Sequence, residues 1–129
     1  MTREKLRAGG YSTVYSTFGD RAAALRASRT LVEERLAACA NLFSLDSVYC
    51  WKGRVHHEPE VGVFIKTRRA LVPRLISRLR TLHPYENPCA VEIPLARGRS
   101  QYLDWIDDCT APVRAPGQRR RRSRAGGAR

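Results

Sequence analysis

The segment LHPYE, residues 82–86, gathers a histidine, a tyrosine and a carboxylate around a proline. An imidazole and a carboxylate are ligands that copper and zinc accept in proteins. Because a bent segment after a helix can bring residues three apart together, His83 and Glu86 form the first candidate metal site. His83 also fits a structural role, as a hydrogen-bonded residue at a helix end where its cationic form suits the helix dipole.

Three further side chains, Glu60, Lys66 and Tyr85, are candidates for a binding cleft. Glu60 or Lys66 can join His83 if the cleft lies between subunits. Tyr85, like Glu86, equally fits hydrogen bonding at an interface. A cysteine enzyme would need a thiolate beside a base that a third group orients, and no local motif indicates one. We therefore expect no catalytic residue and no enzymatic activity.

A second pair of imidazoles, His56 and His57, is adjacent in the sequence. Neighbouring residues on a strand face opposite ways, so the two cannot chelate one ion in regular β-structure. His56 and Glu58 do share a face. A weak surface metal contact there competes with the simpler interpretation of a solvated hairpin.

The four cysteines lie at least 11 residues apart, with no C-x-x-C pair that would indicate zinc or a thioredoxin-type site; they are Cys39, Cys50, Cys89 and Cys109. Buried thiols are the default interpretation. Helical spacing places Cys39 on the apolar stripe of a first helix and Cys109 on a last one. We expect packing rather than reactivity for both.

The charge of the chain is concentrated at its ends. The 129 residues carry a formal net charge of +12, yet residues 114–129 hold seven arginines and no acid, and residues 1–9 add a further +2. Residues 10–113 are nearly balanced, with 14 basic and 11 acidic residues. We predict a flexible segment at 1–9, one folded domain at 10–113 and a disordered arginine-rich tail at 114–129.

The arginine tail leaves two interpretations open. It can contact nucleic acid or an acidic partner through nonspecific electrostatics, or it can be a solvated tail. The sequence has no apolar run long enough to span a membrane and no signal-peptide core, so a cytoplasmic location is expected, without a membrane partner.

Strand and helix patterns alternate along the folded part. Residues 11–18 are rich in aromatic and β-branched types and predict a strand. From Asp20, an apolar spacing of three and four predicts a helix of about 18 residues that ends near Asn41. Residues 42–51 and 55–67 flank a glycine and predict a β-hairpin, with Pro59 at an edge or bulge.

The second half repeats the order. Residues 68–82 predict a helix. Pro73 is tolerated in its first turn, and Pro84 ends it at about Leu82. Residues 89–98 predict a last strand, and Ser100 is a candidate cap for a short terminal helix. The order βαββαβ plus a helix is the ferredoxin-like plan of the α+β class, an antiparallel sheet with both main helices on one face.

Such a sheet leaves its other face uncovered. If Tyr49, Trp51 and Phe64 point to that face, the exposed apolar patch is too large for a monomer, and we expect self-association. An RNA-recognition module shares the element order, but residues 60–67, EVGVFIKT, lack its glycine-aromatic signature. Nucleic-acid binding by the folded core is therefore not expected.

Taken together, five segments resemble the CutA family of divalent-cation tolerance proteins. They are ERLAACANL, SVYCWKG, the frame from Glu60 to Thr67, LHPYE and YLDW. The resemblance covers roughly residues 11–110 and implies a ferredoxin-like protomer in a tight homotrimer, with long hairpins that pair across subunits. It implies a role in tolerance of copper and other divalent cations, with ions or small effectors bound near subunit clefts and no established reaction.

Copper-binding proposals for that family rest on a thiol in the first strand and two histidines before Pro-Tyr. The matching positions here are Ser16, Leu82 and His83, so two of the three ligands are absent. The resemblance thus supports the fold more strongly than the metal. Copper or another divalent cation remains the expected ligand, and none is expected to be required for folding.

Overall fold

The computed structural model describes residues 3–113. The arginine-rich segment at 114–129, for which we predicted disorder, lies outside the described residues. Within residues 1–9, where we expected no fixed structure, Leu6–Ala8 form a short strand, β1.

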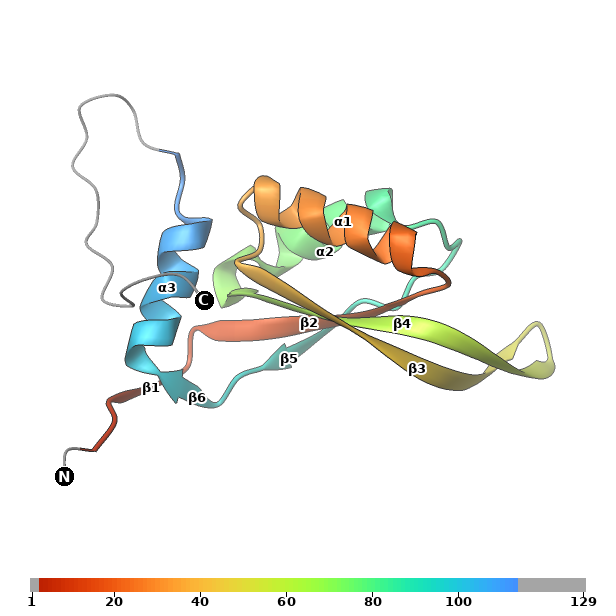
Figure 1. The fold of residues 1–129 in the computed structure, drawn as a ribbon, viewed down its shortest axis with the longest axis horizontal. Helices are drawn as coiled ribbons and strands as arrows, with labels where there is room; N and C mark the ends of the chain where they lie inside the picture. The colour runs from red at the N-terminus through yellow and green to blue at the C-terminus, as the bar shows by residue number, and fades with distance from the viewer. Residues whose placement is uncertain (1–2, 114–129) are drawn as a thin grey trace.

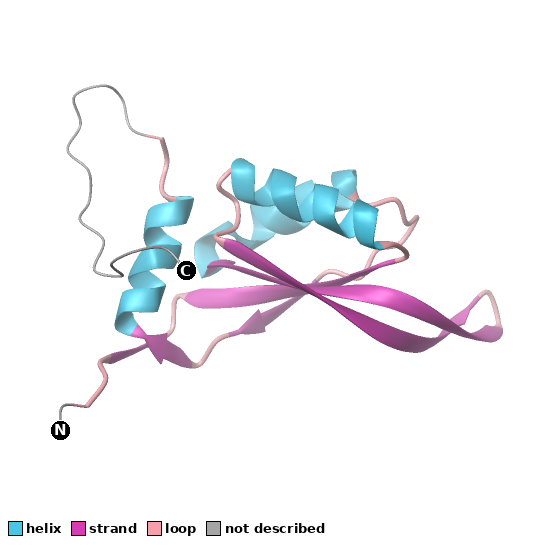
Figure 2. Cartoon of the chain, viewed as in Figure 1, coloured by secondary structure: helices cyan, strands magenta, loops and turns pink. Residues whose placement is uncertain are grey.

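An antiparallel sheet of four strands in the order β3-β4-β2-β5 forms the centre of the fold (Figures 1 and 2). The strands are β2 (Tyr11–Phe18), β3 (Cys39–Trp51), β4 (Arg54–Arg68) and β5 (Val91–Pro94). Helices α1 (Arg21–Glu33) and α2 (Val72–Leu82) lie side by side on one face of this sheet. The predicted ferredoxin-like α+β architecture is confirmed.

The core lies between the two helices and the sheet. Alternate residues of β2 and β4 point to the helices, and the helices contribute one apolar stripe each. The buried set includes Val14, Phe18, Ala24, Leu31, Val63, Ile65, Leu75 and Leu79. As predicted, Asp20 caps α1, by accepting the Ala23 N–H at 2.8 Å, and Pro73 lies in the first turn of α2. A 3₁₀ turn that was not predicted, Arg69–Leu71, precedes α2.

Helix α1 is shorter than predicted. It ends at Glu33, and Arg35 adopts the left-handed conformation, with φ of 62°. The chain then enters β3, so Cys39 is the first residue of a strand and its predicted place on the helix stripe is wrong. The guanidinium of Arg35 binds the carbonyls of Asp108 and Ala111 at 2.6 and 2.5 Å, which holds this turn against the end of the last helix.

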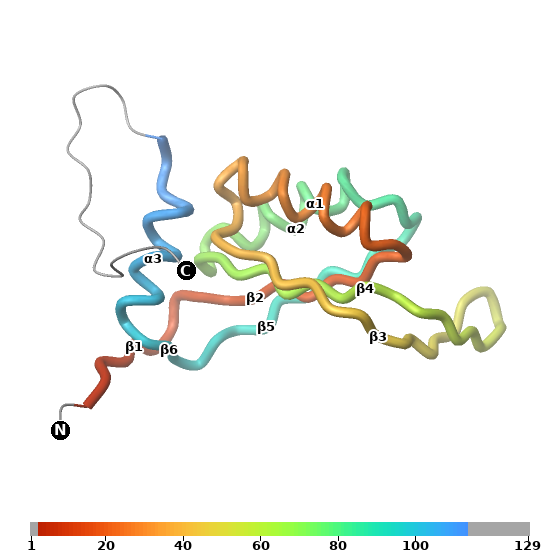
Figure 3. The backbone as a smooth tube through the Cα atoms, in the orientation of Figure 1, coloured from red at the N-terminus to blue at the C-terminus, as the bar shows by residue number. Residues whose placement is uncertain are grey.

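The β3–β4 hairpin extends well past the helices (Figure 3). Lys52 and Gly53 both have positive φ, which suits the two-residue turns that match strand twist. Strand β2 pairs with β4 only from Val61 to Arg68, so Arg54 to Glu60 have β3 alone beside them. Pro59 lies in that stretch, and its predicted place at an edge is confirmed.

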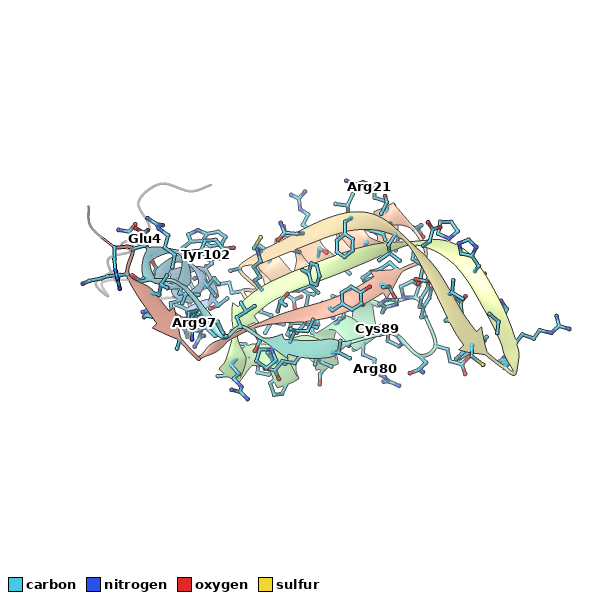
Figure 4. The ribbon with its side chains drawn as sticks, turned by 90° about the horizontal axis from the view of Figure 1, so that it is seen from below. Glu4, Arg21, Arg80, Cys89, Arg97 and Tyr102 are labelled. Atoms are coloured by element: carbon cyan, nitrogen blue, oxygen red, sulfur yellow. The ribbon has the colours of Figure 1, made fainter. Side chains whose placement is uncertain are left out.

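The sheet face opposite the helices is uncovered (Figure 4). Tyr15, Phe43 and Phe64 contact one another there, with ring centroids 5.1 to 6.5 Å apart. Val91 and Ile93 extend the apolar surface on β5 and are exposed. A single copy of the chain therefore presents a broad apolar face to water.

Beyond the end of the sheet, strands β1 and β6 (Arg97–Arg99) pair with each other beside helix α3 (Ser100–Thr110). Arg7 of β1 reaches Asp104 at 3.0 Å and donates to Tyr11 at 3.2 Å. The predicted last strand is thus divided into β5 and β6. Ser100 is the first residue of α3 rather than its cap.

Among residues 3–113, no helix has the length and apolarity needed to cross a membrane.

Candidate functional site

The candidate site forms where β2 stops and β4 continues. Phe18, the last residue of β2, pairs with Val61, so the adjacent Glu60 faces an open edge. Tyr85 fills that edge from the loop after α2 and donates its hydroxyl to Glu60 Oε2 at 2.6 Å. Hydrogen bonds to an ionised acceptor are short and strong, so this bond orients the carboxylate.

Two local features of the sequence put Tyr85 in place. Pro84 disfavours helical geometry for the preceding residue, and α2 ends with His83 extended at φ −85° and ψ 134°. Gly19 then leaves room for the ring, because a Cβ at that position would lie 3.0 Å from the Tyr85 hydroxyl. A side chain at position 19 would therefore be tight against Tyr85.

His83 is buried, with 7% of its surface exposed, and stacks on Phe18 at a centroid distance of 4.0 Å. Its Nε2 lies 2.8 Å from the Thr17 carbonyl oxygen, and its Nδ1 accepts the Tyr85 N–H at 3.1 Å. This pattern requires the neutral ring with the proton on Nε2. Burial lowers the pKa of His83, opposed by the bond to Thr17 and by the charge of Glu60.

Burial is the largest cause of the pKa shifts around Glu60, and Glu60 itself contributes to each of them. Burial and then the hydrogen bond to Glu60 raise the pKa of Tyr85, and burial followed by the Glu60 charge raises the pKa of Cys89. Figure 4 places Cys89 beside β2, and its thiol lies 3.7 Å from the Tyr15 carbonyl oxygen. The site thus combines a carboxylate with groups that are neutral at pH 7.

The hairpin adds a second carboxylate. Tyr49 donates to Glu58 at 3.0 Å, which raises the pKa of Tyr49, and it stacks on His56 at 5.3 Å. Glu58 and Glu60 are two residues apart in β4 and therefore lie on the same face of the strand. Sequence reasoning missed Tyr49 and Gly19 as parts of the site. The i, i+2 spacing of Glu58 and Glu60 is a signal for the site, and Tyr49 lies diagonally across the hairpin from Glu58, because Tyr49 pairs with His56.

The remaining predicted residues lie elsewhere. Lys66 is six residues from Glu60 along β4, about 20 Å at strand spacing, and its amine donates to Tyr102 of α3 at 3.3 Å. Glu86 is exposed in the loop. His57 faces Asp46 at 3.3 Å, whereas His56 contacts Tyr49, so the two adjacent histidines do point apart. The fold therefore unites His83, Tyr85 and Glu60, but not Lys66.

The donor set of one chain is incomplete for a metal ion. In residues 3–113, no group of three or more His, Cys, Asp or Glu side chains is placed to hold one. The two tyrosines bind Oε2 of Glu58 and of Glu60, and carboxylate oxygens suit divalent cations. Both nitrogens of His83 are already hydrogen-bonded. A complete ligand set would need atoms from a second copy or a rotation of His83.

Comparison with known proteins gives one consistent family. The profile of the family described as CutA1 divalent ion tolerance protein matches residues 12–109. Protein CutA of Mus musculus is 38% identical over 106 residues, which cover 81% of this chain and 60% of the mouse protein. The divalent-cation tolerance protein CutA of Pyrococcus horikoshii is 40% identical over 93 residues, 72% of this chain and 91% of that protein.

Solved structures agree with the sequence comparison. The periplasmic divalent cation tolerance protein CutA of Archaeoglobus fulgidus is similar in fold, with a TM-score of 0.76 and 32% identity over 78% of this chain and 98% of that one. The present chain spans about 60% of the length of the mouse and human relatives it matches. It covers nearly all of the archaeal proteins.

Proposed function

Because this chain belongs to the CutA1 divalent ion tolerance family, we propose that it binds a divalent cation, copper or another, or a small effector at the edge formed by Glu60, Tyr85 and His83. The family is named for tolerance of divalent ions rather than for a reaction, and we propose that the protein acts by binding, without catalytic turnover. Its physiological role is then metal tolerance or signalling.

The contact between Tyr85 and Glu60 carries this proposal. It holds a carboxylate at an open strand edge, 2.6 Å from the hydroxyl that orients it, and beside the apolar face on which a second copy can pack. We propose a homotrimer in which the neighbouring subunit completes the site, with Lys66 of another copy or the exposed Glu86 as further contributors. We also propose a cytoplasmic location for this protein, whereas the Archaeoglobus relative is described as periplasmic.

Calorimetric titration of the full chain with Cu²⁺ and with Zn²⁺ tests the site. Glu60→Gln keeps an acceptor for Tyr85 but removes the charge, so cation binding should weaken about tenfold or more. His83→Ala should also weaken binding measurably if the ring joins the ligand set. His57→Ala, on the opposite face of the hairpin, is the matched control and should bind as the parent does.

Two outcomes of that titration are decisive. If Glu60→Gln and His83→Ala both give isotherms indistinguishable from the parent, the proposed edge is not the cation site. If only Glu60→Gln weakens binding, Glu60 is a ligand and His83 is structural.

A second function rests on the composition of residues 114–129, with seven arginines and no acid. In this alternative the folded trimer is a scaffold, and the basic segment recruits a nucleic acid or an acidic partner through charge. A chain ending at Val113 separates the two functions. The alternative is supported if this truncation abolishes RNA binding in a filter assay and the parent shows no cation binding; it is rejected if RNA retention is unchanged.

A further inference from the structure

The layer formed by α1 and α2 carries the excess positive charge of the folded domain. Residues 21–34 and 69–82 hold seven arginines and two glutamates, a balance of +5. The rest of residues 10–113 holds seven basic and nine acidic side chains, a balance of −2. The seven arginines are Arg21, Arg26, Arg29, Arg69, Arg74, Arg78 and Arg80. One face of the domain is therefore basic, although the domain as a whole is nearly balanced.

Only part of this charge is neutralised within the chain. Three of the seven arginines have a carboxylate oxygen within 4 Å. The shortest of these pairs joins Arg78 of α2 to Glu34 at the end of α1, through two hydrogen bonds of 2.7 and 2.8 Å. Within residues 3–113, no ion pair involves the other four, which are all exposed: Arg21, Arg26, Arg74 and Arg80. These four guanidinium groups can bind an anion from outside the chain.

The arginines extend across the whole width of the helix layer. On α1, Arg26 is one turn from Arg29, and on α2, Arg74 is one turn from Arg78, so each helix has neighbouring arginines along its surface. Figure 4 shows Arg21 and Arg80 at opposite margins of the molecule. Because α1 and α2 lie side by side (Figure 1), the positive charge forms one broad surface.

The composition of this surface favours a nucleic-acid backbone over a folded protein as its partner. Protein interfaces depend on aromatic or large apolar anchors near their centre, and neither α1 nor α2 contains an aromatic residue. The exposed large apolar side chains of the two helices are Leu25 and Val32, both on α1. Arginine forks instead match phosphate oxygens, and binding through phosphates needs no apolar anchor.

We propose that the outer surface of α1 and α2 binds the sugar-phosphate backbone of a nucleic acid. An RNA-recognition module stacks bases on its sheet, whereas this surface lies on the opposite side of the sheet and contacts phosphates. Burial of the uncovered sheet face in the proposed trimer would leave the helix layer accessible. The inference concerns the folded domain and rests neither on the cation edge at Glu60 nor on residues 114–129.

The test is fluorescence anisotropy of a short labelled duplex, RNA or DNA, titrated with the full chain at several salt concentrations. Two double variants remove equal charge from different surfaces. Arg26→Gln with Arg74→Gln alters the helix layer, where glutamine keeps a good helix propensity. Arg54→Gln with Arg97→Gln is the matched control, because both arginines are exposed on strands and have no ion pair among residues 3–113.

The helix-layer variant should bind about tenfold more weakly at low salt, because it loses two phosphate contacts. Its slope of log affinity against log salt should be shallower by about 2, one for each lost contact. The strand variant should bind nearly as the parent does. Loss of binding to either duplex in the helix-layer variant alone supports the inference, and the two duplexes identify which nucleic acid supplies the phosphates.

Four results would overturn the inference. Absence of salt-dependent binding of both duplexes by the parent excludes a backbone site. Equal weakening in the two double variants means that net charge, and not this surface, attracts the duplex. Displacement of the duplex by an acidic peptide of equal charge and concentration assigns the surface to an acidic protein. If the chain ending at Val113 loses binding while the helix-layer variant keeps it, the basic segment is the binding element, so the two proposals remain distinguishable.

Discussion

His83 connects three parts of the chain through one buried ring. Its nitrogens join Thr17 of β2 to the backbone of Tyr85, and its face covers Phe18. Protonation would place a hydrogen on Nδ1, where the ring now accepts the Tyr85 N–H. The neutral form of His83 is therefore part of the folded structure.

A pH dependence of stability follows from this ring. Because the pKa of His83 is lowered in the folded chain, the unfolded chain binds more protons near the ordinary value of about 6.5. The contribution of His83 is present above that pH and is lost as the pH falls through the lowered pKa. In urea unfolding at several pH values, the urea concentration at the midpoint should fall less below pH ~6.5 in His83→Gln than in the parent.

The control for this prediction is His57→Gln. His57 is exposed beside Asp46, and its replacement should leave the pH slope of the parent nearly unchanged. An equal slope in the parent and in His83→Gln would show that other groups cause the acid sensitivity.

At the scale of elements, the junction between α1 and β3 shows where sequence reasoning works and where it fails. The apolar spacing through Leu36 and Cys39 continues the helix pattern, yet the helix ends at Glu33. The break depends on Arg35, which takes a left-handed conformation and binds the end of α3, more than 70 residues away. No local pattern reports such a contact, whereas Pro84 ended α2 at the predicted residue through local sterics alone.

The same contrast holds for the other elements and the site. The hairpin and both main helices follow from local patterns, and so does the fold class. Strand β1 exists only because Leu6–Ala8 meet β6 about 90 residues later. Within the site, the place of His83 at a helix end was predictable, but its union with Glu60 depends on Tyr85 crossing to another element.

Arg35 can be tested with two substitutions. Arg35→Ala loses the hydrogen bonds to α3 and should lower the free energy of unfolding by about 1.5–3 kcal/mol. Arg35→Gly loses the same bonds but relieves a left-handed conformation worth roughly 1–2 kcal/mol, so it should be less destabilised. Urea denaturation of both variants at one protein concentration measures the difference.

An Arg35→Gly variant that is less stable than Arg35→Ala would contradict this account. The left-handed backbone would then not be the strained part of the junction.

For the whole molecule, the sheet face opposite the helices is uncovered in the single chain. Tyr15, Phe43 and Phe64 form a continuous aromatic group there, and burying such a group against other copies would be strongly favourable. The proposed trimer would cover this surface, and in the proposal its neighbouring subunit also completes the edge at Glu60.

Light scattering tests the assembly directly. The parent should have about three times the chain mass of 14.6 kDa. Phe64→Asp places a charge in the aromatic group and should shift the mass toward that of one chain. Leu25→Asp, at an exposed apolar position of α1 on the opposite side of the sheet, should keep the mass of the parent. A parent of about 15 kDa would refute the trimer.

The part of the hairpin that extends beyond β2 also affects how many copies of the chain can assemble. From Arg54 to Glu60, β4 has β3 on one side only, and an open strand edge is a template on which further chains can add without limit. Pro59 lies next to the Glu60 end of that stretch and offers no amide hydrogen to an incoming strand. We expect the proline to act as a terminator of polymerisation, so that copies of this chain close into a finite ring instead of growing into a fibre.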